Sequence, residues 1–288
     1  MKLVIAKSAG FCFGVKRAIN KAFEVAKADR NVFTLGPIIH NPQVIEALAA
    51  QGVGVARDIT ELKQANAKKV IIRTHGISLE DMSMLKQEGF DVMDLTCPYV
   101  KKAQHYAKLL KKEGYQVVIL GDIEHPEVIG LKSYAGKAAW VVKDAEGLPK
   151  EIKSKVGLIV QTTQPIEALK RLISKVVEQT RQMKVYNTIC SSTAQKLKET
   201  EEVAKGADVM LVVGGRNSAN TTQLARLCEH LSVPTHHIET AGELQERWFR
   251  GARKIGLTAG ASTPDWIIEG VIKVLKDMGG CNDNGNQR

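Results

Sequence analysis

The chain has 288 residues, a hydrophobic fraction of 44% and a formal net charge of +10. A chain of this length can form a large hydrophobic core, divided over two or three domains. Its apolar runs are too short to span a membrane. Its five cysteines are too few for a disulfide scaffold. The lysines lie mostly on expected helix faces, without a long basic run or stacking aromatics, so we attribute the charge to a solvated surface and expect no nucleic acid as partner. No signal peptide precedes the first strand, so we expect a cytoplasmic protein.

Short apolar strands and amphipathic helices alternate along the chain, and glycine or proline usually separates them. Strands are expected at 2–6, 32–35, 53–56, 70–76, 92–95, 117–120, 138–142, 156–160, 184–186, 209–213, 235–238 and 254–257. Helices are expected at 15–28, from 42 onward, and at 79–87, 99–113, 126–134, 165–179, 193–205, 221–230 and 265–278. Regular alternation of this kind is typical of an α/β fold with parallel sheets and crossover helices.

One pattern occurs three times and sets the organisation of the chain. Each copy has a cysteine before a helix, a glycine 24 residues later at the end of the next strand, and a polar residue 28 after the cysteine. We therefore predict three α/β units related by pseudo-threefold symmetry, at 1–95, 96–188 and 189–278, with a disordered tail at 279–288. The first strand should complete the sheet of the last unit. The repeated residues are Cys12, Cys97 and Cys190, then Gly36, Gly121 and Gly214, then His40, His125 and Ser218.

The three repeated cysteines indicate a shared metal site. Ligands of α/β proteins bind at the carboxyl ends of the strands, where these cysteines lie, so we expect them to converge on one central cleft. Each also precedes a helix start, which stabilises the thiolate. Three thiolates suit either zinc with an open position or an iron–sulfur cubane with one free iron. Cys228 and Cys281 do not share the repeated position, and we assign them no role.

Polar side chains at the turns after the strands indicate an anionic substrate. Several of them stand beside a helix N-terminus, where free N–H groups bind phosphate. Glu127 is the only carboxylate among these turns; we expect nearby negative charge to raise its pKa and make it a proton donor, with Thr162 to orient it. The expected donors to a phosphorylated anion are His40, His75, His125, Ser218, Asn220 and Ser262.

From about residue 3 to residue 278 the chain resembles the 4-hydroxy-3-methylbut-2-enyl diphosphate reductases of the non-mevalonate isoprenoid pathway. Many ordered motifs carry this resemblance, which makes it highly specific. They are AGFCFGV (9–15), GPIIHN (36–41), RTHG (73–76), DLTCP (94–98), HPEV (125–128), QTT (161–163), NTIC (187–190), GGRNSANT (214–221) and GASTP (260–264).

The resemblance implies one [4Fe–4S] cluster on Cys12, Cys97 and Cys190, whose open apical iron binds the allylic hydroxyl of the substrate. Two electrons and two protons then remove the oxygen as water, and protonation of the allyl anion gives isopentenyl diphosphate and dimethylallyl diphosphate. Glu127 would donate the proton, supported by Thr162. The substrate-binding residues implied are His40, His75, His125, Thr162, Ser218, Ala219, Asn220 and Ser262.

The chain departs from the family pattern at Ala219, where many members have serine, so that only the backbone can bind there. Ser191 and Ser192 also stand where aspartate and alanine are usual. As partners we expect an electron donor such as ferredoxin or flavodoxin, which the basic surface could dock, and the protein is expected to be a monomer. The residues alone leave two rivals open: a zinc hydrolase of a phosphorylated substrate, and an iron–sulfur sensor that binds nucleic acid.

Overall fold

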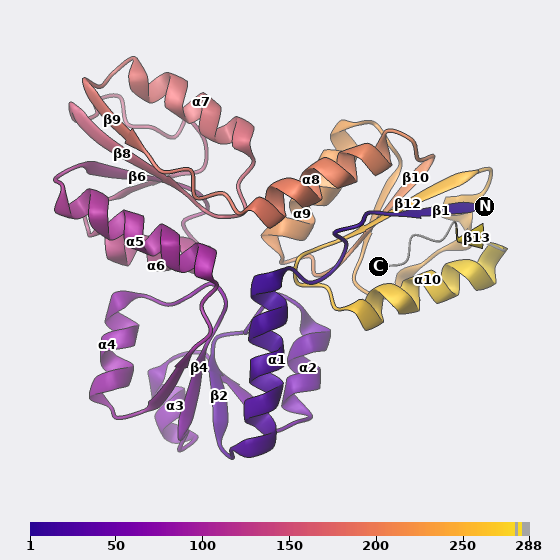
Figure 1. Cartoon of the computed structure of the whole chain (residues 1–288), viewed down its shortest axis with the longest axis horizontal. Helices are drawn as coiled ribbons and strands as arrows, with labels where there is room; N and C mark the ends of the chain where they lie inside the picture. Colours follow the sequence, from indigo (N-terminus) through magenta and orange to yellow (C-terminus); the bar gives the residue numbers. More distant parts are fainter. Residues whose placement is uncertain (280–281, 284–288) are drawn as a thin grey trace. The chain divides into compact units, whose positions relative to one another are not determined.

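The computed structural model describes residues 1–279 and 282–283, which form two compact units (Figure 1). The first unit contains residues 1–16, residues 40–45 and the described residues from 191 onward; the second contains residues 17–39 and 46–190. Every strand pairing among the described residues is parallel, as the alternation of strands and helices predicts. Among the described helices, none is both long and apolar enough to cross a lipid bilayer.

The first unit holds one sheet with the strand order β11-β10-β12-β1-β13. The N-terminal strand β1 pairs with β12, so the expectation that it completes the last sheet is confirmed. Its elements are β1 (Lys2–Ile5), α8 (Ser191–Ala204), β10 (Val209–Val213), α9 (Ala219–His230), β11 (Thr235–Ile238), the 3₁₀ turns η1 (Ala241–Glu243) and η2 (Glu246–Phe249), β12 (Lys254–Ala259), α10 (Asp265–Gly279) and β13 (Asn282–Asp283).

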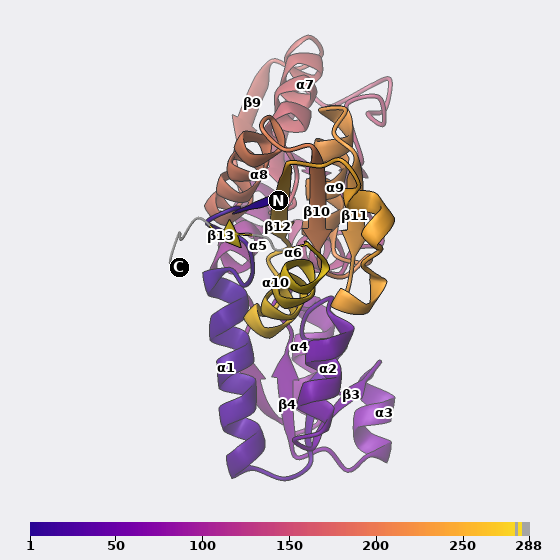
Figure 2. The same cartoon turned by 90° about the vertical axis from the view of Figure 1, so that its right-hand side faces the viewer.

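The two faces of this sheet bury alternate residues of the same strands. Leu211 and Val213 of β10 pack with α10, η1 and η2 on one face, whereas Met210 and Val212 pack with α8 and α9 on the other. Figure 1 and Figure 2 show α10 on the opposite side of the sheet from α8 and α9. Because both faces are covered, the strands read as continuous apolar runs.

The second unit holds two four-stranded sheets, ordered β3-β2-β4-β5 and β7-β6-β8-β9. Helices α1 (Phe13–Ala28) and α2 (Pro42–Ala49) begin in the first unit and continue into the second. The other elements are β2 (Val32–Leu35), β3 (Val53–Ala56), α3 (Ile59–Gln64), β4 (Lys69–Ile72), α4 (Leu79–Gln87), β5 (Asp91–Asp94), α5 (Pro98–Lys112), β6 (Gln116–Leu120), α6 (Pro126–Ala135), β7 (Trp140–Val142), β8 (Lys155–Val160), α7 (Ile166–Val177) and β9 (Gln182–Val185).

Each of these sheets has its own apolar core. Helices α3 and α4 pack on one face of the first sheet. In the second sheet, α7 packs against Val118 and Leu120 of β6, whereas α5 and α6 pack against Val117 and Ile119 on the other face. The three-sheet α/β fold was thus correctly predicted, while the proposed boundaries between its units stay a prediction.

Helix α3 was not predicted. It is only 6 residues long, and its start is capped by Asp58, whose side chain accepts the N–H of Glu61. The predicted disordered tail falls largely on residues 280–281 and 284–288, outside the described residues. Helix α10 extends through Gly279, and residues 282–283 pair with β1. The disorder of the tail stays a prediction.

Candidate active site

Glu127 lies in the first turn of α6, at the carboxyl end of β6. Pro126 fixes the first helical position, and His125 caps the helix, because its Nδ1 accepts the N–H of Glu127 at 3.1 Å. Glu127 is only 1% exposed. Its two carboxylate oxygens accept both donors of Thr162, the main-chain N–H at 2.7 Å and the hydroxyl at 2.8 Å. The predicted pairing of Glu127 with Thr162 is therefore present in the structure.

Burial raises the pKa of Glu127 to about 7, against the two hydrogen bonds from Thr162, which lower it. We predicted a raised pKa from neighbouring negative charge; the structure gives burial as the cause instead. Near neutral pH this carboxyl group holds its proton about half of the time, whereas an ordinary glutamic acid is ionised. A group with this pKa can both hold and release a proton under working conditions, as general acid catalysis requires.

Two predicted histidines lie together in the second unit. The rings of His75 and His125 meet edge to face, with centroids 5.2 Å apart and planes at 88°. Since Nδ1 of His125 accepts a main-chain N–H, a neutral His125 carries its proton on Nε2 and can donate it to a ligand. Thr74 anchors the turn of His75, because its hydroxyl and its N–H both donate to the main-chain oxygen of Ile38.

The three repeated cysteines occupy equivalent main-chain positions. Each follows the strand that pairs with β12, β4 or β8, and each is half-buried. Each donates its main-chain N–H to a carbonyl in the turn that carries another predicted site residue. These bonds run from Cys12 to Ala261 at 3.2 Å, from Cys97 to Thr74 at 2.9 Å, and from Cys190 to Thr162 at 2.9 Å.

The three cysteines also stand directly before the helices α1, α5 and α8. Three sulfur donors at equivalent strand ends form a donor set that fits a thiolate-bound metal group. Cys228 differs from these three cysteines in its position and in the environment of its thiol. It is buried in the apolar cluster under α9, and burial raises the pKa of its thiol to about 12, which keeps it protonated.

The first unit brings together a polar cradle, which we define as His40, Ser218, Asn220 and Ser262. Ser218 caps α9 and accepts the N–H of Thr221. The hydroxyl of Ser262 lies 3.4 Å from that of Ser218 and 3.5 Å from the main-chain oxygen of His40. Asn220 accepts the N–H of Ala261 at 2.8 Å through its Oδ1.

The amide Nδ2 of Asn220 is buried and has no hydrogen-bond partner among the described residues. An unsatisfied buried donor is costly, so this group is suited to a ligand acceptor. Ala219, the first residue of α9, lies between Ser218 and Asn220 and offers a backbone N–H only. Gly215 gives the cradle its close packing, because a Cβ there would come within 2.6 Å of the main-chain oxygen of His40.

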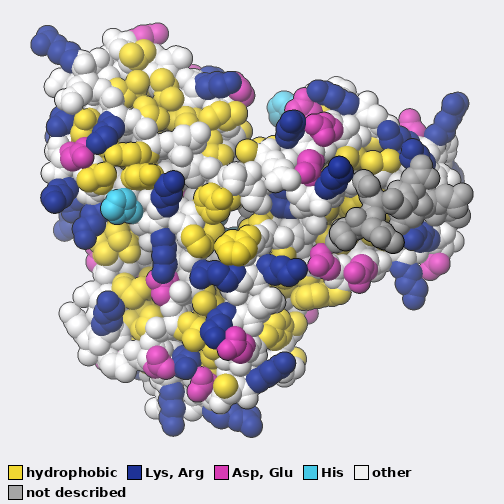
Figure 3. Space-filling model, viewed as in Figure 1, with side chains coloured by type: hydrophobic (Ala, Val, Ile, Leu, Met, Phe, Trp, Pro, Cys, Tyr) yellow, Lys and Arg dark blue, Asp and Glu magenta, His cyan; other side chains and the backbone are white. Residues whose placement is uncertain are grey.

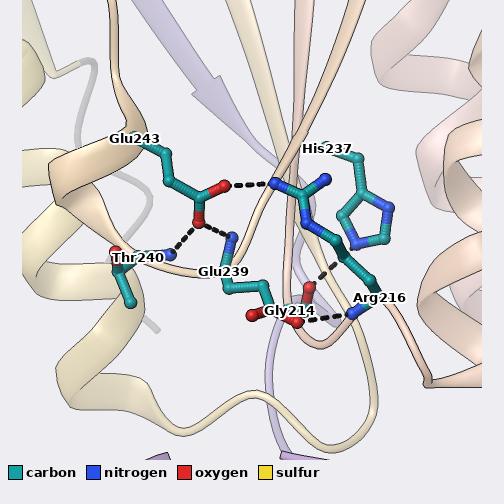
Figure 4. Close-up of polar contacts among 6 residues, drawn as sticks. All are labelled: Gly214, Arg216, His237, Glu239, Thr240 and Glu243. Atoms are coloured by element: carbon teal, nitrogen blue, oxygen red, sulfur yellow. Dashed lines mark hydrogen bonds and ion pairs between the residues drawn. The ribbon is translucent and has the colours of Figure 1, made fainter.

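Charged contacts hold the loop between β10 and α9 that leads into Ser218 (Figure 4). Arg216 donates its main-chain N–H to Glu239 at 2.7 Å, and its guanidinium pairs with Glu243. Glu243 also accepts the N–H of Glu239 at 2.6 Å. His237 donates its Nε2–H to the main-chain oxygen of Gly214 at 2.8 Å. The turn after β11 therefore braces the cradle loop.

Asn41 directly follows the cradle residue His40, and its role was not predicted from the sequence. It is 1% exposed, and its Oδ1 accepts the N–H of Val44 at 3.0 Å. Its Nδ2 has no hydrogen-bond partner among the described residues and can serve a ligand. The motif GPIIHN contains this residue, but the same asparagine also caps α2, and sequence alone does not separate the two roles.

Lys and Arg side chains are spread over the face shown in Figure 3, interspersed with Asp and Glu. This distribution agrees with the interpretation of the charge as a solvated surface. Within the second unit, helix α5 exposes a run of basic residues, which are Lys101, Lys102, Lys108, Lys111 and Lys112.

Comparison with known proteins gives the family. The LytB protein family model matches residues 3–276. The chain is similar to the 4-hydroxy-3-methylbut-2-enyl diphosphate reductase of Pelobacter propionicus, with 46% identity over 94% of this chain and 96% of the relative. It is similar to that of Trichlorobacter lovleyi, with 45% identity over 96% of this chain and 99% of the relative.

Solved structures agree with this assignment. The structure of an (E)-4-hydroxy-3-methyl-but-2-enyl diphosphate reductase, described as the terminal enzyme of the non-mevalonate pathway, is 42% identical with a TM-score of 0.71, over 96% of this chain and all of that one. The reductase of Plasmodium falciparum, at 24% identity, shares the fold with a TM-score of 0.90 over 100% of this chain and 93% of that one.

The fold, the buried acid and the polar cradle define an α/β enzyme, and the named relatives place it among the oxidoreductases. The chain belongs to the LytB protein family. The family resemblance drawn from the sequence motifs is thereby confirmed.

Proposed function

We propose that the chain reduces 4-hydroxy-3-methylbut-2-enyl diphosphate to isopentenyl diphosphate and dimethylallyl diphosphate. In this reaction two electrons and two protons replace the allylic hydroxyl by hydrogen and release it as water. The observation that carries the proposal is the pair of Glu127 and Thr162, a buried acid with a pKa of about 7, in a chain 46% identical to reductases of this name.

Cys12, Cys97 and Cys190 hold one [4Fe–4S] cluster through three thiolates and leave the apical iron open. The equivalent positions of the three cysteines, each before a helix N-terminus, support this ligand set. When bound, such a cluster supplies the two electrons singly and a Lewis-acidic iron for the substrate hydroxyl. The remaining steps of binding and proton transfer belong to the side chains of the chain itself.

Glu127 delivers the proton. In its protonated form it can donate to the hydroxyl oxygen of Thr162, which in turn can donate onward to a substrate oxygen. The main-chain N–H of Thr162 keeps the carboxyl group in place in both protonation states. Burial excludes water from the acid, which raises its pKa and keeps its proton available near neutral pH.

The diphosphate is bound by hydrogen-bond donors of the side chains and the backbone. Ser218, Asn220 and Ser262 supply donors beside the N-terminus of α9, where the helix dipole favours an anion. The backbone of Ala219 contributes an N–H at the same helix start. The histidines His40, His75 and His125, and the hydroxyl of Thr162, complete the substrate-binding set.

An acidic electron donor such as ferredoxin or flavodoxin would dock on the exposed lysines of α5, because this helix begins directly after Cys97. Charge reversal of Lys102 and Lys108 should lower turnover with the protein donor and leave turnover with dithionite unchanged. Equal loss with both reductants would contradict the docking surface. We further propose that the protein is a monomer in the cytoplasm.

The test of the function is an anaerobic assay of the purified protein with substrate and a low-potential reductant. Formation of both C5 diphosphates by the wild type, and a loss of most turnover in Glu127→Gln with unchanged iron content, is the expected result. A brown protein with about four irons and four sulfides per chain supports the cubane cluster. A colourless protein with stoichiometric zinc would instead favour the rival hydrolase.

A further inference from the structure

Lys196 of α8 is the largest fully buried side chain among the described residues, with 1% exposed. Buried lysines are rare because removal of the ammonium group from water is costly without strong partners. The Nζ of Lys196 donates to the main-chain oxygens of Ser8 and Gly10, at 2.8 Å from the latter. Both acceptors belong to the turn that leads from β1 into Cys12.

Glu199 lies three residues after Lys196 on α8 and accepts a hydrogen bond from a main-chain N–H of the same segment before Cys12. Its Oε2 accepts the N–H of Ser8 at 2.6 Å. Partial burial acts to raise the pKa of Glu199, but the hydrogen bonds from Ser8 and Gln195 and the charge of Lys196 lower it on balance. The carboxylate is therefore ionised beside a lysine, and the two charges clamp the turn through its N–H and C=O groups.

The turn before Cys12 has a particular need for such a clamp. Six residues, 6–11, separate the end of β1 from Cys12, whereas two, 95–96, precede Cys97 and four, 186–189, precede Cys190. Gly10 adopts φ +100°, a left-handed conformation that ordinary residues avoid. A long irregular segment loses more freedom when its cysteine is fixed, so contacts that fix it in advance favour metal binding.

A second cation repeats this arrangement. Arg17 of α1 donates through its guanidinium to the main-chain oxygens of Leu95 and Thr96, at 3.1 and 2.9 Å, which are the two residues directly before Cys97. Thus the helix that follows Cys190 holds the segment before Cys12, and the helix that follows Cys12 holds the segment before Cys97.

The third member of the cycle uses aromatic rings. Tyr106 of α5, the helix that follows Cys97, stacks on Tyr186 in the segment before Cys190, with ring centroids 3.9 Å apart and planes at 6°. Each cysteine-bearing segment is therefore fixed by the helix that follows another cysteine.

We propose that Lys196 and Arg17 are positioning residues for the metal-binding cysteines: each cation binds the carbonyl groups before one cysteine from the helix that follows another. The inference rests on the proposed cluster. Contacts that orient metal ligands from outside the coordination sphere are typically worth about ten- to a hundredfold in metal affinity. Their loss should therefore appear as faster loss of iron and not as a change in substrate binding.

The test is the rate of iron release from the anaerobically purified holoenzyme to a chelator, followed by visible absorbance, for Lys196→Met and Arg17→Met. Lys198→Met on α8 and Lys27→Met on α1 are matched controls, because both lysines are exposed on the same helices. We expect release about tenfold faster in the first two variants and within about twofold of wild type in the controls. Arg17→Lys should recover most of the retention.

The far-ultraviolet circular dichroism spectrum and the thermal midpoint of each variant separate positioning from general destabilisation. Folded Lys196→Met and Arg17→Met proteins that release iron at the wild-type rate would overturn the inference. If Lys196→Met does not fold, the more accessible Arg17→Met decides alone. A wild-type protein that binds no iron after reconstitution would instead overturn the proposed cluster, so the two failures are distinguishable.

Discussion

The substitution Glu127→Gln isolates the energetic cost of a buried carboxylate. Glutamine keeps an oxygen for the N–H of Thr162 and offers an N–H to its hydroxyl oxygen, but it does not ionise. The pKa of Glu127 rises from its ordinary value of 4.5 to about 7 in the folded protein. As the pH increases, the unfolded chain therefore loses this proton at a lower pH than the folded chain does. The stability from the protonated group is full below pH 4.5 and is lost as the pH rises through 7.

Full ionisation therefore lowers the free energy of unfolding by about 3 kcal/mol, and most of this change falls between pH 5 and pH 8. We expect the glutamine variant to gain this amount relative to wild type over that pH range. The measurement is urea unfolding of both proteins at pH 5 and pH 8 with matched iron content. Other titrating groups are common to both proteins and cancel in the difference.

The pKa itself can be read from the infrared absorption of the protonated carboxyl group of Glu127, assigned by its absence in Glu127→Gln. We expect this band to disappear with a midpoint near pH 7, and turnover to fall through the same midpoint because the protonated acid is the active form. A midpoint near 4.5, together with an unfolding difference that does not change with pH, would refute the assignment of Glu127 as a buried acid.

Substitutions at three further positions test other parts of the candidate site. Thr162→Ala removes the hydroxyl bond that lowers the pKa of Glu127, so the infrared midpoint should move above 7, whereas Thr162→Ser should leave it in place. Cys97→Ser should lose or convert the cluster, and full iron content with an unchanged spectrum would contradict its role as a ligand. Glu243→Gln weakens the partly exposed brace on Arg216, so KM for the substrate should rise about two- to fivefold at unchanged kcat; a fall in kcat alone would contradict a role in binding.

The fold could be predicted to a large extent because its signals are periodic. Strand and helix periods alternate along the whole chain, and the cysteine, glycine and polar residue recur at constant spacing. The pairing of β1 with β12 followed from the position of Cys12, since its strand had to come from the start of the chain. Helix α3 escaped because its 6 residues carry less than two turns of helical periodicity.

The candidate site was predicted less completely, for a physical reason. Glu127 and Thr162 were paired from their motifs, but the cause of the raised pKa was wrong, since burial depends on packing that one motif does not contain. The donor Nδ2 of Asn41 was missed because capping by its Oδ1 explains the residue equally well. The brace on Arg216 was missed because Glu239 and Glu243 come from a turn more than twenty residues later in the chain.

Lys196 shows why the sequence repeat does not reveal the contacts that hold the segments before the three cysteines. In the proposed cluster all three cysteines present a thiolate to one metal group, which would account for their shared spacing. The contacts that hold the preceding segments face three turns of different length, and each turn is held by a different chemistry: an ammonium, a guanidinium and an aromatic ring. The cyclic order of these contacts is therefore a property of the fold. If these contacts govern metal retention, loss of either Lys196 or Arg17 should weaken the binding of the same proposed cluster. The effect of the double variant on iron release should then be no larger than the sum of the two single effects.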